Sequence, residues 1–205
     1  MNKIFVTAPA GSGMTFCTKL LNMTIAECGG SKGHERFGLE EKVNQIAILR
    51  NPYDSIASGA ERFLKTSNHK TFIEDGSLLT DISDTEQLIL NIRGEEQRYR
   101  EFFENFNDMD HVLLVSFEFL TKEPIKFIEK VSSRFNVIPR NLNSIKSEDV
   151  FNAMADEDRS NRVPREKNNS RKIIEDLVHD LYKKENWETW KIYSEHKNRL
   201  DEMGL

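Results

Sequence analysis

A stretch of small residues near the start of the chain has the composition of an anion-binding loop. Residues 8–13, Ala-Pro-Ala-Gly-Ser-Gly, lie between an apolar run and a run with helical spacing. Glycines let a backbone wrap closely around an anion, and the N-terminus of a following helix adds unpaired N–H groups and the positive end of its dipole. The segment therefore predicts phosphate binding through backbone donors, although a turn that merely joins strand to helix would have a similar composition.

The same loop departs from the pattern of nucleotide triphosphatases. That pattern, G-x-x-x-x-G-K-[ST], would place Ala8 at the first glycine and Met14 at the lysine. The loop keeps its backbone donors but lacks the charge that reaches the β- and γ-phosphates. This departure argues against an ATPase.

A second candidate for anion binding follows the next apolar run. Arg50 comes directly after residues 43–49, and Ser58 lies eight residues later in a helix that Asn51 should cap and Pro52 should begin. An arginine at the carboxyl end of a strand in an open α/β sheet points into the ligand crevice. With the hydroxyl it could bind a phosphate by charge-assisted hydrogen bonds, while a purely structural Arg-Asn-Pro corner is the alternative.

A basic segment lies late in the chain. Between residues 159 and 172 there is one acid, Glu166, and little that could pack. The segment is a candidate anion-facing loop, and a solvated charged loop is the alternative. Its six basic residues are Arg159, Arg162, Arg165, Lys167, Arg171 and Lys172.

The elements that must position these residues alternate between strands and helices. Apolar runs predict strands over residues 3–7, 43–49 and 111–117, and 3.6-residue spacing predicts helices over 15–27, from Asn51, and over 85–106, 124–135, around 174–181 and from Trp187. Residues 65–84 lack a pattern and predict a long surface excursion. Alternation of this kind favours parallel strands, so we expect an α/β fold with a central, mostly parallel sheet flanked by helices.

Composition restricts the class of protein further. A length of 205 residues fits one domain over residues 1–205, and 38% hydrophobic with 31% charged residues excludes a membrane-embedded or wholly disordered chain. A net charge of -5 gives no general basic field for nucleic acid. Two cysteines are too few for a disulfide framework, and the first apolar run is too short for a signal peptide or membrane anchor. We therefore expect a cytoplasmic protein, with no indication of its oligomeric state.

Three of these segments together resemble one family, the sulfotransferases that use 3′-phosphoadenosine 5′-phosphosulfate (PAPS). Residues 9–16 resemble the family's 5′-phosphosulfate loop, usually P-K-S-G-T-T-x, and residues 50–58 are similar to its 3′-phosphate motif of an Arg with a Ser eight residues on. Residues 112–120, followed by Lys-Glu-Pro at 122–124, resemble its strand ending in Tyr-Glu-x-Leu. The three motifs occur in the family's order over about two thirds of the chain.

The resemblance implies a P-loop-like fold, PAPS as donor, the bisphosphate PAP as product, a small molecule or glycan as acceptor, and no metal. It also implies roles for particular residues. Phe117 takes the position whose ring lies near the adenine, while Arg165 and Lys167 are carried over by position only. The implied nucleotide-binding residues are Ala10, Gly11, Ser12, Gly13, Met14, Thr15, Phe16, Arg50, Ser58, Phe117, Arg165 and Lys167.

A Lys-x-His pair suggests the catalytic groups. Lys32 and His34 look like the family's pair in which His takes the proton of the acceptor and Lys supports the sulfuryl group. The family's loop lysine, however, falls at Gly11, its late R-x-G-x-x-G element is not recognisable, and the link from Cys28 to Val43 leaves little room for the usual second strand. A catalytically degenerate PAPS- or PAP-binding protein and a P-loop nucleotide kinase therefore stay open as alternatives.

Overall fold

The structure is a computed structural model of the chain. It describes residues 4–9, 11–25, 31–33, 43–66, 82–104, 106, 111–140, 142, 145–157 and 169–205.

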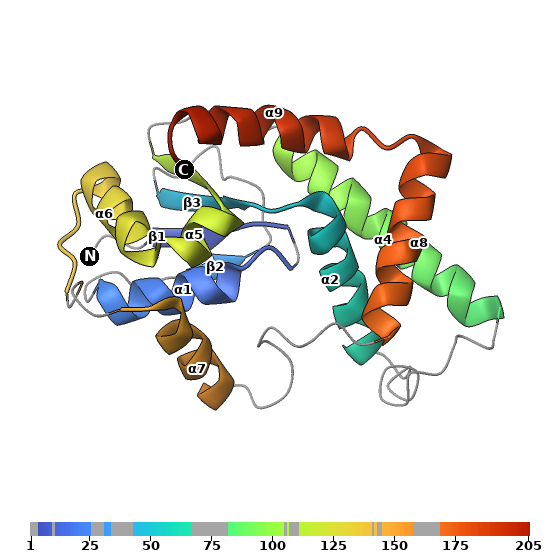
Figure 1. Cartoon of the computed structure of the whole chain (residues 1–205), viewed down its shortest axis with the longest axis horizontal. Coiled ribbons are helices and arrows are strands. Elements are labelled where there is room, and N and C mark those ends of the chain that lie inside the picture. The colour runs from blue at the N-terminus through green and yellow to red at the C-terminus, as the bar shows by residue number, and fades with distance from the viewer. Residues whose placement is uncertain are drawn as a thin grey trace.

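Four parallel strands form the sheet of the described part of the chain (Figure 1). They are β1 (Ile4–Thr7), β2 (Ser31–Gly33), β3 (Asn44–Leu49) and β4 (Val112–Ser116), in the spatial order β2-β1-β3-β4. Val6 of β1 pairs with Lys32 on one side and with Ile46 on the other. The parallel α/β class is thus confirmed. The expectation of little room for a second strand before Val43 is wrong, because three residues of extended backbone suffice for β2.

Helices cover the sheet and extend beyond one of its edges (Figure 1). One expected range, 124–135, coincides with a helix. The excursion expected over 65–84 is shortened at both ends, because one helix runs to Thr66 and the next begins at Ile82; residues 67–81 lie outside the described ranges. The helices are α1 (Met14–Thr24), α2 (Pro52–Thr66), α4 (Ile82–Glu104), α5 (Phe117–Lys122), α6 (Pro124–Phe135), α7 (Ser147–Glu157), α8 (Asn169–Glu185) and α9 (Thr189–Glu202).

Two apolar clusters hold these layers together. The larger one is built around the sheet and includes Ile46, Val115, Leu20, Phe127 and Leu200, each fully buried. The smaller one joins α2, α4 and α8 beside the sheet, where Figure 1 shows the three helices packed together. Its members are Ile56, Ala57, Ala60, Leu88, Ile92, Ile174, Val178 and Leu181. Because burial of apolar area drives association, this second cluster fixes α8 against α2.

An aromatic contact closes the same region near the start of α2. The ring of Tyr53 stacks on Trp190 with centroids 5.3 Å apart and an angle of 28° between the planes. The first turn of α9 therefore lies against the first turn of α2. None of the helices in the described ranges is both long and apolar enough to cross a bilayer.

Candidate anion-binding site

The strand order itself indicates where a ligand should bind. From β1 the chain forms β2 on one side and then β3 on the other, so the carboxyl ends of β1 and β3 flank a topological switch point. Ligands of open parallel sheets bind in the crevice that opens at such a point. The glycine-containing loop follows β1 and Arg50 follows β3, so the sheet brings these two sequence candidates together.

The loop after β1 requires glycine at two positions. Gly11 has φ 74° and Gly13 has φ 92°, both in the left-handed region that other residues rarely adopt. A Cβ on Gly11 would lie 2.4 Å from the Cβ of Ser58, and a Cβ on Gly13 would lie 2.6 Å from the ring of Phe117. The loop therefore passes between α2 and the start of α5 with no space for a side chain at either glycine.

The first turn of α1 presents the backbone donors of the predicted cradle. Gly13 is the N-cap of α1, and its carbonyl already accepts a hydrogen bond from Cys17 N at 3.0 Å. The side chains of Met14 and Phe16 are buried in the core at 8% and 2% exposure. What this turn can offer an anion is its N–H groups, since the first N–H groups of a helix have no partner within it.

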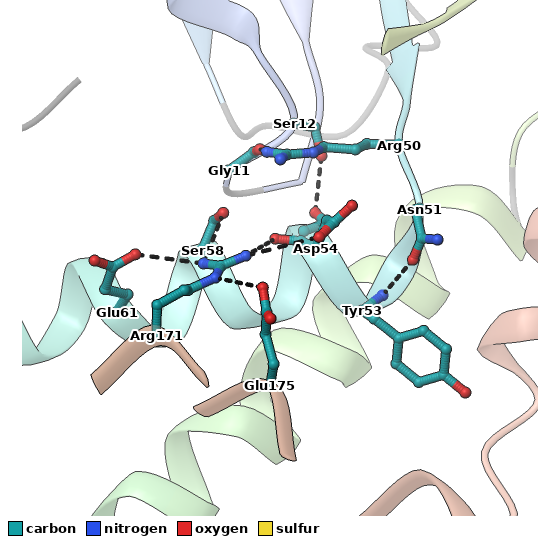
Figure 2. Close-up of polar contacts among 11 residues, drawn as sticks. Gly11, Ser12, Arg50, Asn51, Tyr53, Asp54, Ser58, Glu61, Arg171 and Glu175 are labelled. Carbon is teal, nitrogen blue, oxygen red and sulfur yellow. Dashed lines mark hydrogen bonds and ion pairs between the residues drawn. The ribbon is translucent and has the colours of Figure 1, made fainter. Parts of the chain in front are cut away.

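Arg50 is held at the edge of the loop from two sides, and Figure 2 shows it beside Gly11. Its Nη1 donates a hydrogen bond to the carbonyl of Gly11, and its guanidinium carbon lies 4.6 Å from the centre of the Phe117 ring. The Tyr99 hydroxyl donates to the carbonyl of Arg50 at 2.6 Å, which fixes the backbone where β3 ends. Burial raises the pKa of the Tyr99 phenol, so this donor keeps its proton throughout the neutral range.

Ser58 contacts Arg171, a residue that the sequence analysis placed in a loop. Nη1 of Arg171 donates to Ser58 Oγ at 3.0 Å, and its Nη2 donates to the carbonyl of Asp54 at 3.1 Å (Figure 2). Arg171 was expected in an anion-facing loop, but it lies buried in the first turns of α8. The expected loop was wrong at this position, because Arg171 continues the helical spacing of residues 174, 178 and 181, which its charged neighbours had obscured.

Three carboxylates surround Arg171. Glu175 Oε1 lies 2.9 Å from its Nε, Glu61 Oε2 lies 3.4 Å from Nη1, and Asp54 Oδ1 lies 3.9 Å from Nη2. These groups compensate its charge, as a buried guanidinium requires.

The charge of Arg50 is less well compensated. Burial lowers the pKa of its guanidinium, the carboxylates of Asp54, Glu118 and Glu175 raise that pKa, and the positive charge of Arg171 lowers it. No carboxylate of the described residues lies within ion-pair distance of it. Two guanidinium groups thus lie beside the N-terminal turn of α1, where the positive end of the helix dipole also favours negative charge, so this region is a candidate anion-binding site.

Some sequence candidates cannot be placed. Ala10, His34, Arg165 and Lys167 lie outside the described residues, and of Lys32 only the backbone within β2 is described. In the described ranges no group of three His, Cys, Asp or Glu side chains could hold a metal ion.

Comparisons with known proteins give structural matches only. No protein-family model matches the chain, and no curated protein matches it. Mouse sulfotransferase SULT7A1 complexed with PAP aligns at 13% identity and a TM-score of 0.46, over 75% of this chain and 63% of that chain. This chain thus spans less than two thirds of the mouse protein.

Two further solved structures align over most of both chains. A sulfotransferase from Alicyclobacillus acidocaldarius aligns at 13% identity and a TM-score of 0.36, over 87% of this chain and 95% of the other. The sulfotransferase domain from the curacin biosynthetic pathway aligns at 11% identity and a TM-score of 0.39, over 86% and 96%.

Proposed function

We propose that this protein binds PAPS at the switch point and transfers its sulfuryl group to a hydroxyl or amine acceptor, with PAP as the product. The observation that carries the proposal is the pair of guanidinium groups, Arg50 and Arg171, beside Gly11 and Ser58. A nucleotide with a phosphate on each of two ribose oxygens matches a site with cations on one side and helix donors on the other. The order of the three family-like motifs supports the same ligand.

The two phosphates of the ligand bind different groups. The 5′-phosphosulfate lies on the N–H groups of residues 13–16, where the positive end of the α1 dipole favours an anion. The 3′-phosphate takes hydrogen bonds from Arg50, Ser58 and Arg171. Charge-assisted hydrogen bonds of this kind are about twice as strong as neutral ones.

The transfer step is an in-line displacement at sulfur. The acceptor oxygen or nitrogen forms the new bond to sulfur while the bond from sulfur to the bridging phosphate oxygen breaks, and PAP leaves with that electron pair. A base receives the acceptor proton, and a cation stabilises the leaving oxygen. His34 and Lys32 are our candidates for these roles. No metal is needed, because the mixed anhydride is already activated, and we place the reaction in the cytoplasm.

One observation favours a second candidate function, binding of PAP or PAPS without transfer. The family's loop lysine falls at Gly11, where φ is 74° and the Cβ position lies 2.4 Å from Ser58 Cβ. A lysine does not fit at position 11, so the loop lacks the positive charge that the family's lysine supplies. Transfer then depends on another positive group at the leaving oxygen.

Thermal unfolding with nucleotides tests the proposal. A ligand at 100 times its dissociation constant stabilises a protein by about 2.7 kcal/mol, so PAP should raise the midpoint far more than 5′-AMP or ATP with magnesium. Arg50→Ala should remove this preference, whereas Arg93→Ala, which changes an exposed arginine paired with Glu185, should keep it. Equal stabilisation by PAP and 5′-AMP would refute the nucleotide assignment.

Transfer of labelled sulfate from PAPS to a panel of acceptors separates the two candidate functions. Turnover by the parent supports the enzyme, and tight PAP binding without turnover supports the binding protein. If His34 is the base, His34→Ala should keep PAP affinity and lose about 10²–10⁴ in rate.

A further inference from the structure

We infer that Ser55 is a positioning residue that couples the two phosphate subsites; this inference rests on the proposed function. Its hydroxyl shares a hydrogen bond of 2.8 Å with the hydroxyl of Ser12, across 43 positions of sequence. Both serines are 1% exposed. A buried bond between two short side chains fixes the distance between their backbones, so it joins the loop to α2.

Ser55 lies between Arg50 and Ser58, two of the residues proposed to bind the 3′-phosphate. Arg50 directly precedes Asn51, the N-cap residue of α2, whose Oδ1 accepts a hydrogen bond from Tyr53 N at 3.0 Å. Ser58 lies one turn beyond Ser55 on the same helix face. Movement of the first turns of α2 therefore moves Arg50 and Ser58 together.

Two more contacts join this segment to the loop. Arg50 Nη1 donates to the carbonyl of Gly11, and the Gly11 Cβ position lies 3.0 Å from the carbonyl oxygen of Ser55. The loop and residues 50–58 are thus in contact at the serine pair, at the arginine and along Gly11. Of these contacts, the serine pair is the one whose side chains need not contact the ligand.

Coupling follows from this arrangement. A phosphate on the N–H groups of residues 13–16 orders the loop, and the loop orders α2 through Ser12 and Ser55. The second phosphate then meets Arg50 and Ser58 already in place and loses less conformational freedom on binding. By linkage, the 3′-phosphate strengthens the 5′-subsite by the same factor.

A cycle of four ligands measures this coupling. The dissociation constants of adenosine, 5′-AMP, 3′-AMP and PAP are determined by calorimetry for the parent and each variant. Without coupling, the gain from adding both phosphates equals the product of the two separate gains. In the parent we expect PAP to exceed this product by a factor within the usual range for allosteric coupling, about 5–150-fold.

Three variants separate positioning from plain structural support. Ser55→Ala should reduce the coupling factor to near one while each monophosphate keeps its affinity within about threefold. Because that change leaves the Ser12 hydroxyl buried, the double variant Ser12→Ala/Ser55→Ala removes both partners and should recover stability without recovering coupling. Thr24→Val is the matched control, since it removes a buried hydroxyl that donates to Leu20 O at 2.7 Å at the far end of α1. It should keep the parent's coupling.

The outcomes distinguish the inference from the proposed function. If the parent binds PAP and Ser55→Ala keeps its coupling factor, Ser55 is only structural and the inference is wrong. The inference also fails if the double variant regains coupling with stability. If the parent binds PAP no better than adenosine, the proposed function fails and the coupling fails with it.

Discussion

The two arginines beside the loop are held in opposite ways. Arg171 is enclosed by Asp54, Glu61 and Glu175, and it also donates to the hydroxyl of Ser58. Arg50 instead has a backbone carbonyl and an aromatic ring as partners. Carboxylates neutralise a guanidinium, whereas a carbonyl and a ring only orient it. Arg50, which has no carboxylate within ion-pair distance among the described residues, therefore has more of its charge available for a ligand than Arg171, which also holds α8 against α2.

This difference separates binding from stability at one site. A residue whose charge is compensated within the fold stabilises the fold, and its removal exposes the groups that compensated it. A residue whose charge is not compensated within the fold contributes mainly to the affinity for a ligand. The substitutions below test this division, beginning with the largest expected effect.

Arg171→Ala should be the most destabilising of these changes. It leaves three carboxylates facing one another with no cation between them, and removal of one partner from a buried ionic cluster lowers the free energy of unfolding by about 3 kcal/mol. Urea denaturation measures this change. Arg93→Ala breaks the exposed pair with Glu185 and should change stability far less. Equal losses for the two variants would mean that the enclosure of Arg171 is not stabilising.

Arg50→Ala should affect binding more than folding. Hydrogen bonds to charged groups contribute about 1.5–3 kcal/mol, so the affinity for PAP should fall by that amount in calorimetry while urea denaturation changes little. Arg50→Lys keeps the charge but not the planar fork, and should recover only part of the affinity. A loss of stability as large as that of Arg171→Ala would remove the distinction between the two arginines.

Phe117→Leu should have the smallest effect. It removes the ring face that orients Arg50 but leaves the hydrogen bond to Gly11, and a cation–π contact contributes about 0.5–2 kcal/mol depending on its exposure. We expect a modest loss of PAP affinity by calorimetry, smaller than that of Arg50→Ala. Phe117→Tyr keeps a ring and should bind as the parent does. If leucine binds PAP as tightly as phenylalanine, the ring does not position Arg50.

Local signals in the sequence predicted much of this fold. Pro124 at the first position and an apolar spacing up to Phe135 define α6 without help from the rest of the chain. Asn51 and Pro52 mark the start of α2, and the cap is confirmed by the hydrogen bond from Tyr53 N. Such features succeed because their causes lie within a few residues of each other.

Features that depend on distant partners were missed. β2 has three residues, and its pairing with β1 supplies the hydrogen bonds that make it a strand. Arg171 was grouped with its charged neighbours because its carboxylate partners come from positions 54 and 61 on α2 as well as from Glu175. The contact of Ser12 with Ser55 has no local signature at all. The sequence thus predicted individual residues of the site, but the contacts between them became visible only in the folded structure.

The stacking of Tyr53 on Trp190 gives the protein an internal optical probe. The chain has two tryptophans. One of them, Trp190, lies against Tyr53 in the first turn of α2, and Tyr53 is three residues after Arg50. A ligand that shifts this turn changes the surroundings of the indole and with them its emission. We therefore expect intrinsic fluorescence to follow occupancy of the site without an added dye, with Trp190→Phe as the reference in which only Trp187 emits.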